Sequence, residues 1–154
     1  MKRLLMVLGL LAAASAFGSD DVTVKLGNIS VVGTHTNFWF EPTVIIHNST
    51  LKPLTAANLF LRPSGLALRI SDLDGKELKR VYRAPYMIEP RWIIRSGDNT
   101  FTNISYGFEA WNGGHPSISL PDGVHTVRVQ VDGTLSGSSY TNRLTSNIVE
   151  VQVP

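Results

Sequence analysis

The sequence contains no cysteine among its 154 residues. This absence excludes a disulfide-stapled scaffold, a cysteine nucleophile and a cysteine-linked lipid anchor. Small extracellular domains often depend on disulfides, whereas a chain of this length can bury enough apolar surface to fold on its core alone. We therefore expect one domain, stabilised by its hydrophobic core.

The sequence has one long apolar run, which lies at its start, and no other. Met1-Lys2-Arg3 is a basic start, Leu4 to Ala14 is apolar apart from Gly9, and Ala14-Ser15-Ala16 is a small-x-small cleavage sequence. This pattern is typical of a secretory signal peptide, and its apolar run is too short to span a bilayer. We expect a signal peptide over residues 1–18 and a mature domain over 19–154. The protein is predicted to be periplasmic or secreted and not membrane-spanning, and the missing cysteine favours a bacterial source.

An excess of charge of one sign is also missing. The chain has 14 Lys and Arg against 12 Asp and Glu, and removal of Lys2 and Arg3 with the signal leaves 12 of each. A net charge of zero argues against a broad basic surface, so no nucleic-acid partner is predicted. The segment from Arg62 to Arg95 nevertheless holds eight bases and four acids. This excess indicates either an ordinary solvated face or an arginine-rich face that meets an acidic partner.

Motifs for catalysis and cofactor binding are absent as well. There is no Gly-x-Ser-x-Gly run, no phosphate-binding Walker loop and no Gly-x-Gly-x-x-Gly run. The histidines are His35, His47, His115 and His125. No two of them have the His-x-His or His-x-x-x-His spacing of metal ligands. We predict a protein that is not an enzyme and that has neither a cofactor nor a metal site.

The sequence does contain a clear period of two. Large apolar residues alternate with polar ones over Val22 to Leu26 and Val127 to Val131, and with Ala67, Arg69 and Ser71 after Leu66, which is typical of half-buried strands. The Asp-Gly pair within Ser71 to Lys76 predicts a hairpin turn, because glycine adopts positive φ at little cost. No capped helical stripe is present. We predict an all-β, immunoglobulin-like two-sheet antiparallel β-sandwich of about seven to nine short strands.

Three finer expectations concern irregular positions. Pro42 is predicted to break or bulge the strand that starts near Phe38. A strand is predicted over Phe101 to Phe108. The Asp132-Gly133 pair is predicted to open a Gly/Ser-rich loop that runs through Tyr140, with the last strand over Ile148 to Val153.

Two resemblances support the fold. The run from Leu120 to Val129, Leu-Pro-Asp-Gly-Val-His-Thr-Val-Arg-Val, resembles the last hairpin of many bacterial immunoglobulin-like domains. His125 stands where those domains often carry a corner tyrosine, so the resemblance implies a hydrogen bond from its ring to nearby backbone. Leu144 to Val151, with Asn48-Ser49-Thr50 and Leu73 to Lys76, is similar to the β-sandwich pro-domain of deuterolysin-type zinc proteases. Because the sequence has no His-Glu-x-x-His run, this similarity supports the fold more than an inhibitory role.

Aromatic residues beside arginines are the candidate binding residues, because exposed Trp, Tyr and Arg dominate binding hot spots. The predicted function is an interaction module that binds another protein of the envelope or secreted fraction, as an inhibitor, latency partner or accessory subunit. The predicted partner-binding residues are Tyr82, Arg83, Tyr86, Arg91, Trp92 and Arg95. The alternative is a carbohydrate-binding module in which Trp92, Trp111 and His115 stack on a glycan. Trp92 and Trp111 are also candidates for plugging the ends of the sandwich.

Overall fold

The structure is a computed structural model that describes residues 21–34, 37–60, 65–83, 91–109, 115–116, 118–137 and 140–154. The predicted signal peptide, residues 1–18, lies outside these ranges. Within them the chain forms strands and turns and no helix. The described ranges contain nine strands of three or more residues and two strands of two residues each.

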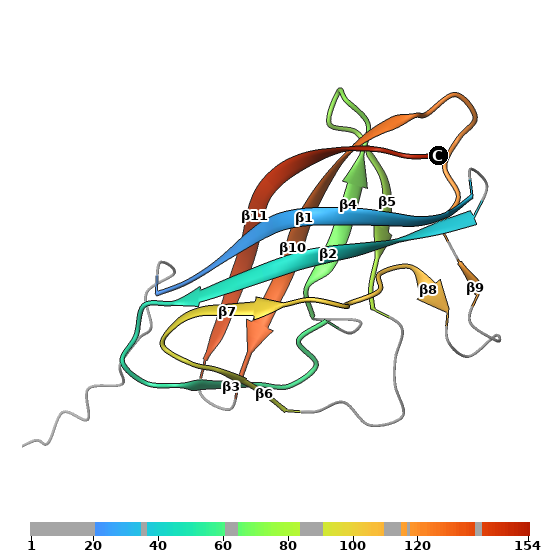
Figure 1. The fold of residues 1–154 in the computed structure, drawn as a ribbon. Coiled ribbons are helices and arrows are strands. Elements are labelled where there is room, and N and C mark those ends of the chain that lie inside the picture. Colours follow the sequence, from blue (N-terminus) through green and yellow to red (C-terminus); the bar gives the residue numbers. More distant parts are fainter. Residues whose placement is uncertain are drawn as a thin grey trace, which may run out of the picture.

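One antiparallel sheet has the strand order β1-β2-β7. Its strands are β1 (Val22–Thr34), β2 (Asn37–Asn48) and β7 (Gly97–Phe101). Figure 1 shows this sheet lying across a second sheet, whose strands run in a different direction.

The second antiparallel sheet has the order β11-β10-β4-β5. Its strands are β11 (Thr141–Gln152), β10 (Thr126–Ser136), β4 (Ala67–Ser71) and β5 (Glu77–Val81). The predicted hairpin joins β4 to β5, and Gly75 in its turn has a φ of 87°. The expected all-β antiparallel sandwich is therefore confirmed as a sandwich-like fold.

Two short ribbons complete the fold. Their strands are β3 (Leu54–Ala56) with β6 (Trp92–Ile94), and β8 (Phe108–Glu109) with β9 (His115–Pro116). In Figure 1 the β3–β6 ribbon runs below β7, at the lower end of β10 and β11. The hydroxyl of Tyr140, the residue just before β11, donates a hydrogen bond to the Thr55 oxygen of β3 at 3.0 Å. The ribbon is thus tied to the end of the second sheet.

The core lies between the two sheets and follows the alternation of the sequence. The residues of β1, β2 and β10 that face inward are almost fully buried, as are Phe38 and Phe40 at 1% and 0% exposure. Tyr106 is fully buried too, and its hydroxyl donates to the Leu66 oxygen at 3.0 Å. That hydrogen bond satisfies the one polar atom that this large side chain brings into the core.

Both sides of the sandwich carry links between the sheets. On one side the Asn147 amide of β11 accepts a hydrogen bond from the Leu26 N–H of β1 at 2.8 Å and donates to the Leu26 oxygen at 3.0 Å. On the other side Tyr106 pairs with both Phe40 in β2 and Arg83 just beyond β5. The two sheets are therefore held together by hydrogen bonds as well as by the core.

The strand around Pro42 differs from the expectation. β2 continues through the proline, and the shift in register falls in its partner β1, between Leu26 and Ile29. Phe40 donates its backbone N–H to the Tyr106 oxygen at 3.1 Å, and alternate residues of a strand point their N–H groups to the same edge. The missing N–H of Pro42 therefore faces the edge where the chain after β7 has left the sheet, and no ladder hydrogen bond is lost.

The two other local expectations are wrong. β7 ends at Phe101, so the predicted strand over Phe101 to Phe108 lies mostly outside strands. β10 continues through Asp132-Gly133 to Ser136, with a shift in its register against β11 between Gln130 and Asp132, and β11 begins at Thr141 instead of Ile148. Gly133 is needed for close packing instead of a turn, because a Cβ there would lie 2.3 Å from the Gly65 oxygen.

Candidate binding surface

The β3–β6 ribbon holds three of the predicted partner-binding residues. Along β6 and its flanks, Arg91 is exposed, Trp92 is half-buried, Ile93 is 62% exposed, Ile94 is buried and Arg95 is exposed. Side chains of a strand alternate between its two faces. The outward face therefore presents an arginine, an isoleucine and a second arginine in a row.

Trp92 lies on the opposite, inward face of β6. Its ring makes edge-on contacts with Phe60 at 5.8 Å and Phe101 at 5.3 Å between ring centroids. The Arg83 guanidinium lies 6.0 Å from the centre of the Trp92 ring, within the range of a cation–π contact. Trp92 thus packs against the edge of the core and connects Arg83 to the ribbon.

The outward face extends from β6 onto β3 and the loop before it. Thr55 of β3 is exposed and pairs with Ile93, and Leu51 in the preceding loop is 96% exposed. Lys52 beside it is also exposed. We name this surface the ribbon face, and it consists of Leu51, Lys52, Thr55, Arg91, Ile93 and Arg95.

Asn48 holds the loop that carries Leu51 and Lys52 against β6. It is fully buried, and its amide nitrogen donates to the Lys52 oxygen at 3.0 Å and to the Ile94 oxygen at 3.2 Å. Its amide oxygen accepts from the Thr50 N–H at 3.0 Å and from the Thr50 hydroxyl at 2.7 Å. One buried side chain therefore fixes the position of the loop beside the end of the ribbon.

The charge of the ribbon face is of one sign. It has three cations, Lys52, Arg91 and Arg95, and none of its own residues is acidic. The next acid along the chain, Asp98, bonds through its carboxylate to His47 at 2.7 Å across β2 and β7. A basic rim around two exposed apolar side chains is suited to an acidic partner that also offers apolar contact.

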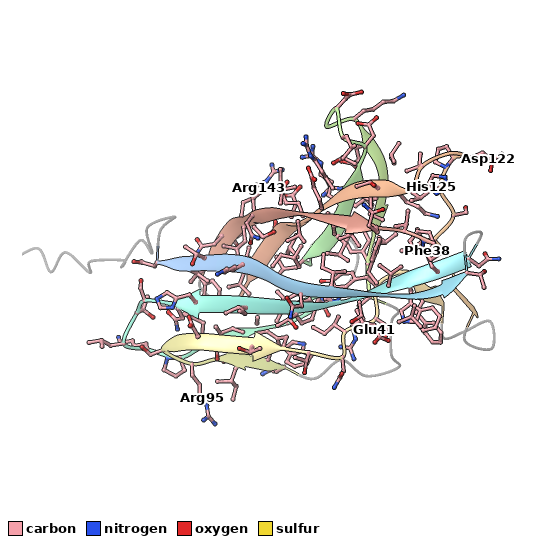
Figure 2. The ribbon with its side chains drawn as sticks, turned by 45° about the horizontal axis from the view of Figure 1, so that its top comes forward. Phe38, Glu41, Arg95, Asp122, His125 and Arg143 are labelled. Carbon is pink, nitrogen blue, oxygen red and sulfur yellow. The ribbon has the colours of Figure 1, made fainter. Side chains whose placement is uncertain are left out.

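The remaining predicted residues lie elsewhere or outside the description. Tyr82 lines a polar hollow near the second sheet. Tyr86 and Trp111 fall outside the described residues, and so does the side chain of His115, whose backbone forms part of β9. Figure 2 shows Arg95 projecting from the side of the molecule opposite Arg143, which lines the same hollow as Tyr82.

Sequence reasoning missed the two apolar residues of the ribbon face. For Ile93 a signal existed, because an alternating strand puts residue 93, and not Trp92, on the face of Arg91 and Arg95. Leu51 gave no such signal, since its exposure follows from the loop geometry set by Asn48.

The described part of the chain lacks the features of two other kinds of site. No three His, Asp or Glu side chains converge there in a way that could hold a metal ion. No helix long and apolar enough to cross a membrane occurs within those ranges.

Comparison with known proteins supports the fold alone. No protein-family model matches the chain, and no curated protein matches it. A similar solved structure is the X-ray structure of Northeast Structural Genomics Consortium target SoR45, with a TM-score of 0.53 and 11% identity over 88% of this chain and 89% of that chain. At that identity the similarity concerns the arrangement of strands.

Proposed function

We propose that this protein is an exported, non-enzymatic interaction module that binds another protein of the envelope or secreted fraction through its ribbon face. The export step rests on the signal peptide predicted from residues 1–18. The single observation that carries the binding step is the row Arg91, Ile93 and Arg95 on the exposed face of β6.

The physical support for this surface is the combination of exposure and charge. Ile93 and Leu51 are 62% and 96% exposed, although both are large apolar side chains. Their burial by a partner would release about 25 cal/mol for each Å² of apolar area. The cations around them would steer an acidic partner and fix its orientation.

The experiment is a capture of partners from envelope and secreted fractions, with protein purified from expression of the whole sequence. We expect one protein to be retained at low salt and lost at high salt, because the screening length shortens from about 10 Å at 0.1 M to about 3 Å at 1 M. Arg91→Glu combined with Arg95→Glu is expected to abolish the capture.

The matched control is Arg128→Glu, which reverses a charge on the second sheet, where Arg128 pairs with Glu150 at 3.0 Å. This control should still capture the partner. Capture that resists high salt, or that survives reversal of both ribbon arginines, would refute the proposed surface.

The glycan-stacking alternative at Trp92 gains no support from its surroundings, because Phe60, Phe101 and Arg83 already contact the ring. We therefore keep the protein-binding proposal as the preferred function.

A further inference from the structure

A small hollow lies on the second sheet, away from the ribbon face. Its volume is about 200 Å³, and its lining includes Gly65, Tyr82, Asp132, Gly133 and Thr134. Gly133 lies so close to Gly65 that a Cβ on Gly133 would meet the Gly65 oxygen at 2.3 Å. The absence of side chains at these two glycines leaves space between the polar residues around them.

Asp132 is the central acceptor of the hollow, and its side chain is only 6% exposed. Its Oδ2 atom accepts a hydrogen bond from Arg80 Nη1 at 3.0 Å. Among the described residues, the contacts of its Oδ1 atom are longer, 3.4 Å to the Thr145 hydroxyl and 3.6 Å to Arg143 Nη2. A carboxylate oxygen buried this deeply normally has shorter partners. Oδ1 therefore retains capacity to accept a hydrogen bond from a ligand.

The two arginines of the hollow differ in availability. Arg80 Nε and Nη2 donate to the two Glu77 oxygens at 3.3 and 3.2 Å, and its Nη1 donates to Asp132. The hydrogen bonds that Arg80 donates to Glu77, and then the one it donates to Asp132, raise the pKa of Arg80 above its ordinary value, so it stays charged. Arg143, by contrast, is 80% exposed and contacts Asp132 only at 3.6 Å. Arg143 can thus donate to a ligand while Arg80 holds Asp132 in place.

The charges narrow the class of ligand by elimination. The cations Arg80 and Arg143 are balanced by the carboxylates Asp132 and Glu77, so neither an anion nor a cation gains a net attraction here. An apolar ligand would leave these charged groups without water. What fits is an uncharged molecule that donates a hydrogen bond and accepts another from adjacent atoms.

We propose that this hollow binds a vicinal diol of a neutral sugar, with one hydroxyl donating to Asp132 Oδ1 and its neighbour accepting from Arg143. The Thr134 hydroxyl is a further polar partner, and Tyr82 supplies an aromatic side chain beside the ring. The volume is below the roughly 300 to 1,000 Å³ of pockets for drug-sized ligands, so one sugar ring is the expected occupant. This site is separate from the ribbon face and does not depend on the proposed protein partner.

The test is titration of the full chain with neutral monosaccharides (glucose, galactose, mannose and N-acetylglucosamine) and with short oligosaccharides of each, followed by NMR shifts of backbone amides. We expect saturable shifts at Gly65, Gly133 and Thr134. Binding of the single sugars assigns a free saccharide as ligand, whereas binding of the oligosaccharides alone assigns a residue within a glycan.

Arg143→Gln is the test variant, because Arg143 is exposed and its loss should leave the fold intact. We expect it to weaken sugar binding at least tenfold, while the control Arg128→Gln on the same sheet leaves binding unchanged. Absence of saturable shifts with every sugar would overturn the proposal. So would equal binding by Arg143→Gln and the unmodified protein, or stronger binding of sodium acetate or sodium sulfate than of any sugar at the same amides.

Discussion

At the scale of single residues, asparagine side chains replace backbone partners where strands do not pair. The Asn147 side chain bonds to both the N–H and the oxygen of Leu26, at 2.8 and 3.0 Å. The Asn99 side chain does the same for Arg95, at 2.8 Å in both bonds. Asn48 ties Lys52 to Ile94 in a similar way. An amide side chain carries one acceptor and two donor hydrogens, so it can satisfy both groups of a peptide unit at once.

The replacement of Asn147 by alanine tests this role. Asn147→Ala leaves both polar backbone groups of Leu26 without their side-chain partner, and we expect the free energy of unfolding to fall by about 1–2 kcal/mol. Urea denaturation measures the change. The control Asn28→Ala alters an exposed asparagine of β1 and should change stability by less than about 0.5 kcal/mol. Equal effects of the two variants would contradict the bridging role.

Tyr106 makes the stability depend on alkaline pH. Burial raises its pKa, whereas an unfolded tyrosine ionises near pH 10. The stabilisation is therefore complete below about pH 10 and is lost as pH rises further, by up to about 1.4 kcal/mol per pH unit for this residue. Tyr106→Phe should reduce the slope of unfolding free energy against pH above 10.

Urea denaturation at several pH values between 9 and about 11.5 measures this slope. Tyr106→Phe should also cost about 1 kcal/mol at neutral pH, because the bond to the Leu66 oxygen is lost. Tyr140→Phe is the control. Burial raises the pKa of Tyr140 as well, but less of this residue is enclosed, so its loss should change the slope less than the loss of Tyr106 does. Slopes that are identical for the unmodified protein and Tyr106→Phe would refute this account.

At the scale of elements, β10 depends on the close approach of Gly133 to Gly65. Gly133→Ala would force a Cβ to within 2.3 Å of the Gly65 oxygen, so the backbone before β4 must shift. We expect a loss of about 1–3 kcal/mol in the free energy of unfolding, measured by urea denaturation. Gly75→Ala is the comparison, because a Cβ there meets no atom within 4 Å and only the φ of 87° opposes it. A Gly133→Ala protein as stable as the unmodified one would contradict the packing argument.

The strands and turns also show which features of the fold can be predicted from the sequence. The alternation of Val127 to Val131 and the Asp-Gly turn before β5 are local signals, and both gave the observed structure. The Asp132-Gly133 pair carries the same local signal as a turn, yet its glycine serves a contact with Gly65, which is distant in sequence. The bridge from Asn147 to Leu26 spans 121 positions. Such contacts have no periodic trace, so they could not be predicted.

The candidate site was predictable only where it depends on local sequence. The run Arg91 to Arg95 was identified from its composition, and the side-chain alternation then decides which residues face outward. Leu51 joins them only through the buried Asn48. The predicted similarity to immunoglobulin-like domains and to protease pro-domains stays a prediction, because the fold alone does not distinguish among sandwiches.

At the scale of the whole molecule, charge is segregated although the predicted mature chain is neutral overall. On the second sheet the arginines pair with acids, as Arg80 does with Glu77 and Asp132. The ribbon face holds three cations without an acid among its residues. Segregation of this kind gives a directed field at one surface without a high net charge. The proposed protein partner should therefore approach from the side of β3 and β6.

The most direct measurement is NMR mapping of the complex between this protein and the partner it captures. The account predicts that backbone amides over residues 51–55 and 91–95 shift on binding, and that amides of β4, β5 and β10 do not. Shifts confined to the second sheet, with none at β3 and β6, would contradict the central claim that the ribbon face binds the partner.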